Sequence, residues 1–324
     1  MKRLAQRIVY GRDRPWSQMF SRIGGWVSYL CFMAAVAVSV YHLSHVGWGR
    51  ILEQLPDSPW FYGFFALSYL SLPVSELWVY RRIWRFPFSE GLRTFLLKRV
   101  YNRDLLGYSG EAYLFFWAQR RLGLPTRAVW QGIKDNNLLS AGISTLLALS
   151  LVGLLLIGNA TLADRILPRW EWTSWAGLAV LGAILGVAGY RFRRFVFHLP
   201  GRVLLELASI HAGRLLLVHI CTIGMWYAGA PGVPLKGLFT LLVVDILSAR
   251  LPGLPGKEVL VMNLQVMLAS SLNFSSASVA ALLLTQIVLE KTLNVLVLAL
   301  QMGNPDRRRA FKQAVSLPEQ ARAA

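Results

Sequence analysis

The chain has 324 residues, of which 55% are apolar and 15% are charged. Soluble domains carry about 25% charged residues, so this composition leaves too little polar surface for an ordinary water-facing globule. The 34 Lys and Arg outnumber the 16 Asp and Glu, but they cluster between apolar segments, which favours membrane-flanking loops over a nucleic-acid-binding face. We therefore predict an all-α membrane protein.

Six apolar segments are long enough to cross a membrane, because a bilayer core about 30 Å thick requires about 20 helical residues. The predicted transmembrane helices are residues 23–42, 60–80, 138–157, 172–190, 203–228 and 275–300. The first follows a basic leader and has no small-residue cleavage site after it, so we expect it to remain as an uncleaved anchor.

The distribution of Lys and Arg sets the predicted orientation. Six lie in the leader, eleven in residues 81–134, four in residues 191–202 and five in the tail after residue 303. The connections on the opposite side hold only one or two each. Because basic residues concentrate on the cytoplasmic side, both termini are predicted to be cytoplasmic.

Two further apolar segments, 91–120 and 235–272, are interrupted by glycine-rich sequences at 106–110 and 251–256. Each half has about 13–17 residues, which is too short to cross the membrane but suits a half-helix of a re-entrant hairpin. Basic residues flank the first hairpin on both sides, so it should enter from the cytoplasm. The second has almost none, and it should enter from outside.

The order span, span, hairpin, span then occurs twice in opposite orientations, which predicts an inverted 3+3 repeat. Each hairpin carries a glutamate just after its break, Glu111 and Glu258, and each following span carries Gln-x-x-x-acid, ending at Asp135 and Glu290. The predicted domains are a leader (1–22), two repeat halves (23–158 and 159–302) and a basic tail (303–324).

These sequences resemble the flippase-like transmembrane region of the lysylphosphatidylglycerol synthases and its stand-alone relatives. The resemblance covers roughly residues 20–300 and is best at Gly110-Glu111 and at Leu-Pro-Gly-Leu-Pro-Gly-Lys-Glu, residues 251–258. It implies a bacterial inner-membrane protein with two re-entrant halves that moves or binds lipids. The chain departs from the family where the first hairpin lacks a Pro-Gly pair and where a lysine precedes Glu258. No synthase domain follows, so we do not expect lipid lysylation.

The fifth predicted span contains ionisable side chains, which are costly inside a bilayer and therefore mark functional candidates. Arg214 lies about 17 Å along this span, near the midplane, and shares a helix face with His211. Its guanidinium predicts a site for a phosphate headgroup, which it can bind through two parallel hydrogen bonds. The alternative is an arginine paired inside the protein with Glu206, Glu258 or Glu290.

Arg250 and Lys257 flank the second glycine-rich break. Together with the positive ends of half-helices they favour an anion, and the alternative is that both side chains extend to the outer interface. We expect the tips of the two hairpins to converge and to gather the charged groups around one polar cavity. The predicted substrate-binding residues are Glu111, Asp135, His211, Arg214, Arg250, Lys257, Glu258 and Glu290.

The sequence contains no nucleophile elbow, P-loop, HExxH or GxGxxG motif, and we expect no cofactor and no metal. The leading hypothesis is a protein that binds or translocates an anionic phospholipid or glycolipid without covalent chemistry. Its predicted partners are that membrane lipid and lipid-biosynthesis enzymes, and no nucleic acid. One alternative is a glycosyltransferase that uses a polyprenyl-phosphate-linked sugar, with Glu53 and Asp57 as its acidic pair. Another is a non-catalytic membrane scaffold.

Overall fold

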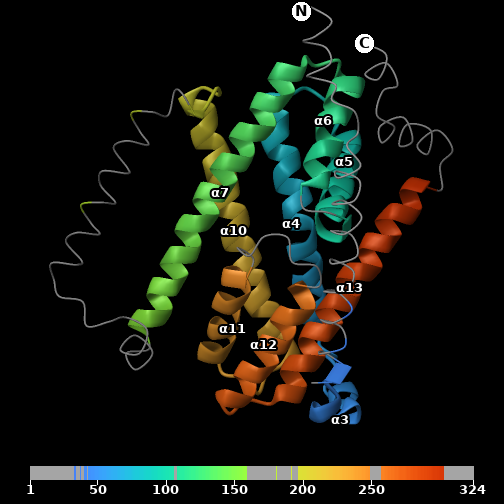
Figure 1. Cartoon of the computed structure of the whole chain (residues 1–324), viewed down its shortest axis with the longest axis vertical. Helices are drawn as coiled ribbons and strands as arrows, with labels where there is room; N and C mark the ends of the chain where they lie inside the picture. The colour runs from blue at the N-terminus through green and yellow to red at the C-terminus, as the bar shows by residue number, and fades with distance from the viewer. Residues whose placement is uncertain are drawn as a thin grey trace, which may run out of the picture.

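The computed structural model describes residues 43–105, 108–158, 196–248 and 257–302, together with isolated positions before residue 43 and between 158 and 196. Every secondary-structure element in these ranges is helical, which confirms the predicted all-α class for them (Figure 1). The leader, the tail, Arg250 and most of the predicted spans 23–42 and 172–190 lie outside the described residues.

Four long helices form the frame: α4 (Pro59–Ile83), α7 (Thr126–Ile157), α10 (Gly201–Gly229) and α13 (Ser276–Met302). Within the described residues, α7, α10 and α13 are long and apolar enough to cross a membrane, and each contains one predicted span. Helix α4 contains the predicted span 60–80 and has 25 residues. It is less apolar than the other three because its sequence includes several serines and tyrosines, two prolines and Glu76.

Shorter helices form two hairpins. The first consists of α5 (Phe88–Val100), a π-helical turn η1 (Tyr101–Leu105) and α6 (Ser109–Leu122), and the second of α11 (Leu235–Ser248) and α12 (Lys257–Ser271). These four α-helices have only 13 to 15 residues, about 20 Å each. In Figure 1, α5 and α6 occupy one half of the bundle, and α11 and α12 occupy the half that also contains α3 (Trp48–Glu53).

The same order of elements occurs twice: a long helix, two short helices and a long helix. Helix α4 starts at the α3 end of the bundle, whereas α10 starts at the opposite end, so the second set runs in the opposite direction (Figure 1). This is the order that an inverted repeat would produce. The repeat itself and the count of six spans remain predictions.

Two hydrophobic clusters hold these halves together. One lies towards α3 and packs residues of α4, α10, α11, α12 and α13, with Phe61 and Trp226 among its fully buried side chains. The other packs α4, α5, α6, α7 and α10 around Tyr80 and Phe95, whose rings stack. By contrast, large apolar side chains such as Leu149 remain exposed on the outside of α7, as expected for contact with lipid.

Gly110 allows the close turn of the first hairpin. A Cβ atom at this position would overlap the carbonyl oxygen of Lys98, so only glycine lets the start of α6 approach α5 so closely. The N–H of Gly110 donates to Oδ1 of Asn102 at 2.7 Å, and the hydroxyl of Ser109 donates to the carbonyl oxygen of Tyr101 at 2.7 Å. These bonds fix the position of the glutamate that follows, Glu111.

Candidate functional site

The tips of the two hairpins meet through an arginine that the sequence analysis did not single out. Nε of Arg103, in η1, lies 2.8 Å from Oε1 of Glu258 and 3.2 Å from Oε1 of Glu290. Glu258 lies in the first turn of α12, and Glu290 lies on α13. One guanidinium therefore joins η1 of the first hairpin and the first turn of α12 in the second hairpin to a candidate span.

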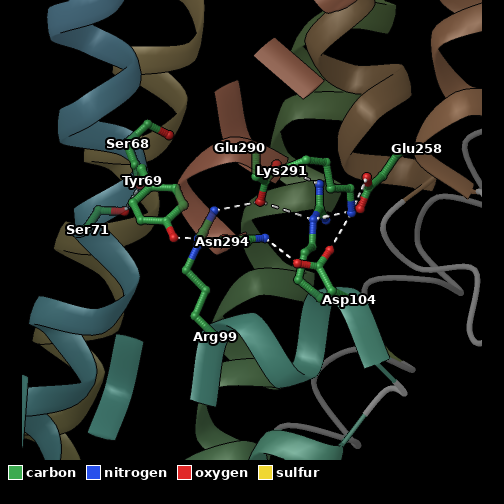
Figure 2. Close-up of polar contacts among 10 residues, drawn as sticks. Ser68, Tyr69, Ser71, Arg99, Asp104, Glu258, Glu290, Lys291 and Asn294 are labelled. Atoms are coloured by element: carbon green, nitrogen blue, oxygen red, sulfur yellow. Dashed lines mark hydrogen bonds and ion pairs between the residues drawn. The ribbon is translucent and has the colours of Figure 1, made fainter. Parts of the chain in front are cut away.

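The same region contains further charged and polar groups (Figure 2). Lys291 pairs with Asp104 and also lies 3.3 Å from Oε2 of Glu258. The amide nitrogen of Asn294 donates to Asp104 at 2.6 Å, while its oxygen accepts from the hydroxyl of Tyr69 at 2.8 Å. Thus Lys291 pairs with Asp104 and Glu258 and not with Glu290, its neighbour on α13. It connects the tips of both hairpins instead.

Arg99, on α5, completes this group of residues. Its Nη2 donates to Oε1 of Glu290 at 2.8 Å, and its guanidinium lies over the ring of Tyr69, 4.4 Å from the ring centre. We call the group the tip network; it consists of Tyr69, Arg99, Arg103, Asp104, Glu258, Glu290, Lys291 and Asn294. Its three cations face three carboxylates, so the network balances its own charge.

A small cavity of about 130 Å³ lies beside the tip network. Its polar wall includes Arg103, Glu258 and Glu290 of the network together with Lys257 and Asp245. Three predicted site residues, Lys257, Glu258 and Glu290, therefore do line one cavity. The other described candidates do not line it.

Glu111 belongs to a second group of charges, on the other side of α5. Nζ of Lys98 pairs with Glu76 and lies 3.3 Å from Oε1 of Glu111, and the Lys98 side chain is only 2% exposed. We call these three residues the Lys98 network. The prediction that Glu111 and Glu258 share one cavity is wrong, because successive residues of α5, Lys98 and Arg99, direct their charges to different networks.

Arg214 lies halfway along α10 and forms no hydrogen bond or ion pair with any described residue; its Nε is buried without a partner. The carboxylates expected to pair with it have other partners. Glu206, near the start of α10, lies 3.6 Å from Arg82 of α4, and Glu258 and Glu290 face Arg103. Glu76 and Arg99 lie within electrostatic range of Arg214. In the described part of the chain, the alternative of internal pairing is therefore not realised.

His211 and Asp135 have structural partners. His211 is buried, and its Nε2 lies 2.9 Å from Oδ1 of Asn136 on α7. The fully buried Asp135 accepts hydrogen bonds from the backbone N–H groups of His198 and Leu199, at 2.7 and 2.9 Å. Asp135 thus fastens α7 to the segment that precedes α10. Its predicted place beside Glu290 is wrong.

The residues that the sequence analysis missed are chiefly the cations of the first hairpin. Lys98, Arg99 and Arg103 fall inside an apolar half-helix and its turn, where the cost of burying charge marks them as candidates. The same three residues are among the eleven Lys and Arg of residues 81–134 that set the predicted orientation. The positive-inside rule assigns clustered Lys and Arg residues to the cytoplasmic side, and it does not distinguish a surface cation from one that pairs inside the protein.

The acidic pair of the alternative enzyme, Glu53 and Asp57, is exposed at the α3 end and lines neither this cavity nor the larger one described below. Among the residues that the structure describes, no three His, Cys, Asp or Glu side chains are placed to hold a metal ion. Comparisons with models of known protein families and with curated protein sequences find no match.

Proposed function

We propose that this chain is a multi-pass protein of the bacterial inner membrane that binds the headgroup of an anionic phospholipid or glycolipid and carries it between leaflets without covalent chemistry. In this proposal the chain has six spans in an inverted repeat, its termini are cytoplasmic, and the two hairpins are re-entrant. The resemblance to the flippase-like region of the lysylphosphatidylglycerol synthases points the same way.

The observation that carries the proposal is the guanidinium of Arg214, which pairs with none of the residues that the structure describes. A charged side chain at the centre of a transmembrane helix costs about 2.5–3.5 kcal/mol on insertion scales, so it is normally paired inside the protein. Here the buried charges of Glu76, Lys98 and Glu290 already pair with other side chains, in the Lys98 network and in the tip network. A phosphate could supply the missing partner, because its oxygens accept two parallel hydrogen bonds from arginine.

The surroundings of Arg214 favour an anion rather than a cation. The Nε atom of Arg99, within electrostatic range of Arg214, is also buried without a partner in the described residues. The nearby carboxylate of Glu76 contacts Lys98, which it shares with Glu111. The Nε–H groups of the two guanidiniums therefore remain available as hydrogen-bond donors to an anion.

The arrangement of the half-length helices supports transport rather than simple binding. The two hairpins extend towards the middle of the bundle from opposite ends, and the tip network joins them there. In transporters built from broken helices, substrates bind near the midplane where such helices meet. We propose that the ion pairs between the tips hold the path closed and exchange partners when a headgroup passes.

The proposal is tested with purified protein in liposomes that contain a fluorescent anionic phospholipid, whose exposure to an external quencher reports translocation. Arg214→Leu should abolish translocation and remove the co-purifying anionic lipid seen by mass spectrometry. The matched control is Arg202→Leu on the same helix, because the Arg202 side chain is 92% exposed. Unchanged translocation in the folded Arg214→Leu protein would contradict the proposal and favour a scaffold.

A further inference from the structure

A second and larger cavity, of about 460 Å³, lies at the α3 end of the bundle. Small-molecule sites have volumes of about 300–1,000 Å³, so this cavity is large enough for one. Its walls come from the segment before α3, α3 itself, α12 and the start of α13. The polar lining residues are His45, Arg50, Asn263, Ser270, Ser275 and Ser276.

The charge of this cavity has one sign. No carboxylate lines it, and Arg50 forms no ion pair with any acid among the described residues. Ser270 and Ser275 add hydroxyl groups, which can donate to an anion, whereas the hydroxyl of Ser276 donates to the carbonyl oxygen of Val266 at 3.5 Å. This lining differs from that of the smaller cavity, which contains both acidic and basic side chains. An anion would therefore be attracted here without a competing carboxylate.

The start of α13 adds backbone donors. The hydroxyl of Ser275 accepts from the N–H of Ser278 at 3.2 Å and so caps one of the first N–H groups of the helix. The N–H groups of Ser276 and Ala277 have no acceptor within the helix, because they precede its first hydrogen-bonded turn. Both residues line the cavity. A 27-residue helix also carries positive potential at this end.

The walls are held by contacts of the core. Ile51 of α3 is fully buried, and the hydroxyl of Ser278 donates to the side-chain oxygen of Gln54 at 2.9 Å, which ties α3 to α13. On the other side, the N–H of Phe274 donates to the carbonyl oxygen of Ala269 at 2.8 Å and fixes the turn between α12 and α13. These contacts hold the backbone on both sides of the cavity in place before any ligand arrives.

We propose that this cavity binds a phosphate group, carried by a phospholipid headgroup or by a soluble phosphate, at a site separate from Arg214. Arg50 supplies the permanent charge, and the hydroxyls of Ser270 and Ser275 together with the first N–H groups of α13 supply the remaining donors. Val266 and Met267 form part of an apolar wall that suits the glycerol or acyl portion of a lipid. The inference goes beyond the proposed function because it requires no translocation.

Calorimetry on the full chain in phosphatidylcholine nanodiscs tests the site with two probes, inorganic phosphate and a water-soluble short-chain phosphatidic acid. Binding of both probes supports a phosphate site open to either source. Binding of only the lipid identifies a headgroup site, and binding of only inorganic phosphate identifies a soluble ligand. If neither probe binds, the proposal is overturned.

Variants locate the binding. Arg50→Gln should raise the Kd at least tenfold, about 1.4 kcal/mol, because a charge-assisted hydrogen bond is lost. Ala277→Leu should also weaken binding by filling the cavity while leaving its charge unchanged. The matched control, Arg202→Gln, removes an exposed arginine from α10 and should leave the Kd unchanged. An unchanged Kd in both cavity variants, or an equal loss in the control, overturns the assignment.

The same titration in the Arg214→Leu background separates this inference from the proposed function. Retained binding that still depends on Arg50 supports a site separate from Arg214, even if translocation by the wild-type protein is never observed. Loss of all binding in the folded Arg214→Leu protein shows that only one site exists, and it overturns the inference.

Discussion

The Lys98 network provides a sharp test of the packing of the first hairpin. Lys98→Met keeps the length of the side chain but removes the cation that contacts Glu76 and Glu111. Lys98 is 2% exposed and Glu76 only 9% exposed in their side chains, so water cannot screen the charges left behind. Removing one partner of a buried ion pair costs about 3–5 kcal/mol, and we expect a loss of unfolding free energy in this range.

The assay is equilibrium unfolding of the purified protein in mixed detergent micelles, followed by circular dichroism. Arg121→Gln is the control, because it removes an arginine whose side chain is 68% exposed and pairs with Glu90; we expect a change of about 0–1 kcal/mol. Adding Glu76→Gln to Lys98→Met should recover part of the loss, because one stranded carboxylate disappears. A Lys98→Met protein within about 1 kcal/mol of wild type would refute the buried pairing.

Three further predictions concern the turn, the contact between the tips and the topology. Gly110→Ala should lower the thermal midpoint far more than Gly142→Ala in α7, where nothing lies within 4 Å of the added Cβ; equal shifts would contradict the close approach of α5 and α6. Arg103→Glu should abolish lipid translocation, and the double variant Arg103→Glu with Glu258→Arg should restore part of it. A double variant that is no more active than the single variant would count against the contact. In a cysteine-free background, Arg121→Cys should react with a membrane-impermeant thiol reagent only from the cytoplasmic side, and labelling from outside would reverse the proposed orientation.

The elements that the sequence predicts well are those that depend on local composition. Long apolar runs locate α7, α10 and α13, because their side chains face outward along most of their length. The glycine-rich breaks divide residues 91–120 and 235–272 into short helices, since Gly110 and its neighbours permit a close turn. Both features require only information from nearby residues.

Pairing between distant residues could not be predicted in the same way. Asp135 and Glu290 occupy equivalent positions in the Gln-x-x-x-acid pattern, yet the first accepts from backbone N–H groups and the second binds arginines. The difference lies in what each helix packs against, which the spacing does not encode. Lys98 and Arg99 show the same effect, because these consecutive residues of α5 point to different sides of the helix and pair with Glu76 and Glu290, respectively.

The central claim is that Arg214 holds the phosphate of an anionic lipid, and an experimental structure of the protein in nanodiscs containing that lipid tests it most directly. The account predicts density for a phosphate within about 2.7–2.9 Å of the Arg214 guanidinium nitrogens, with no protein carboxylate in that place. The density should disappear in Arg214→Leu. An Arg214 guanidinium paired with a carboxylate of the chain, or a lipid phosphate bound only elsewhere, would contradict the account.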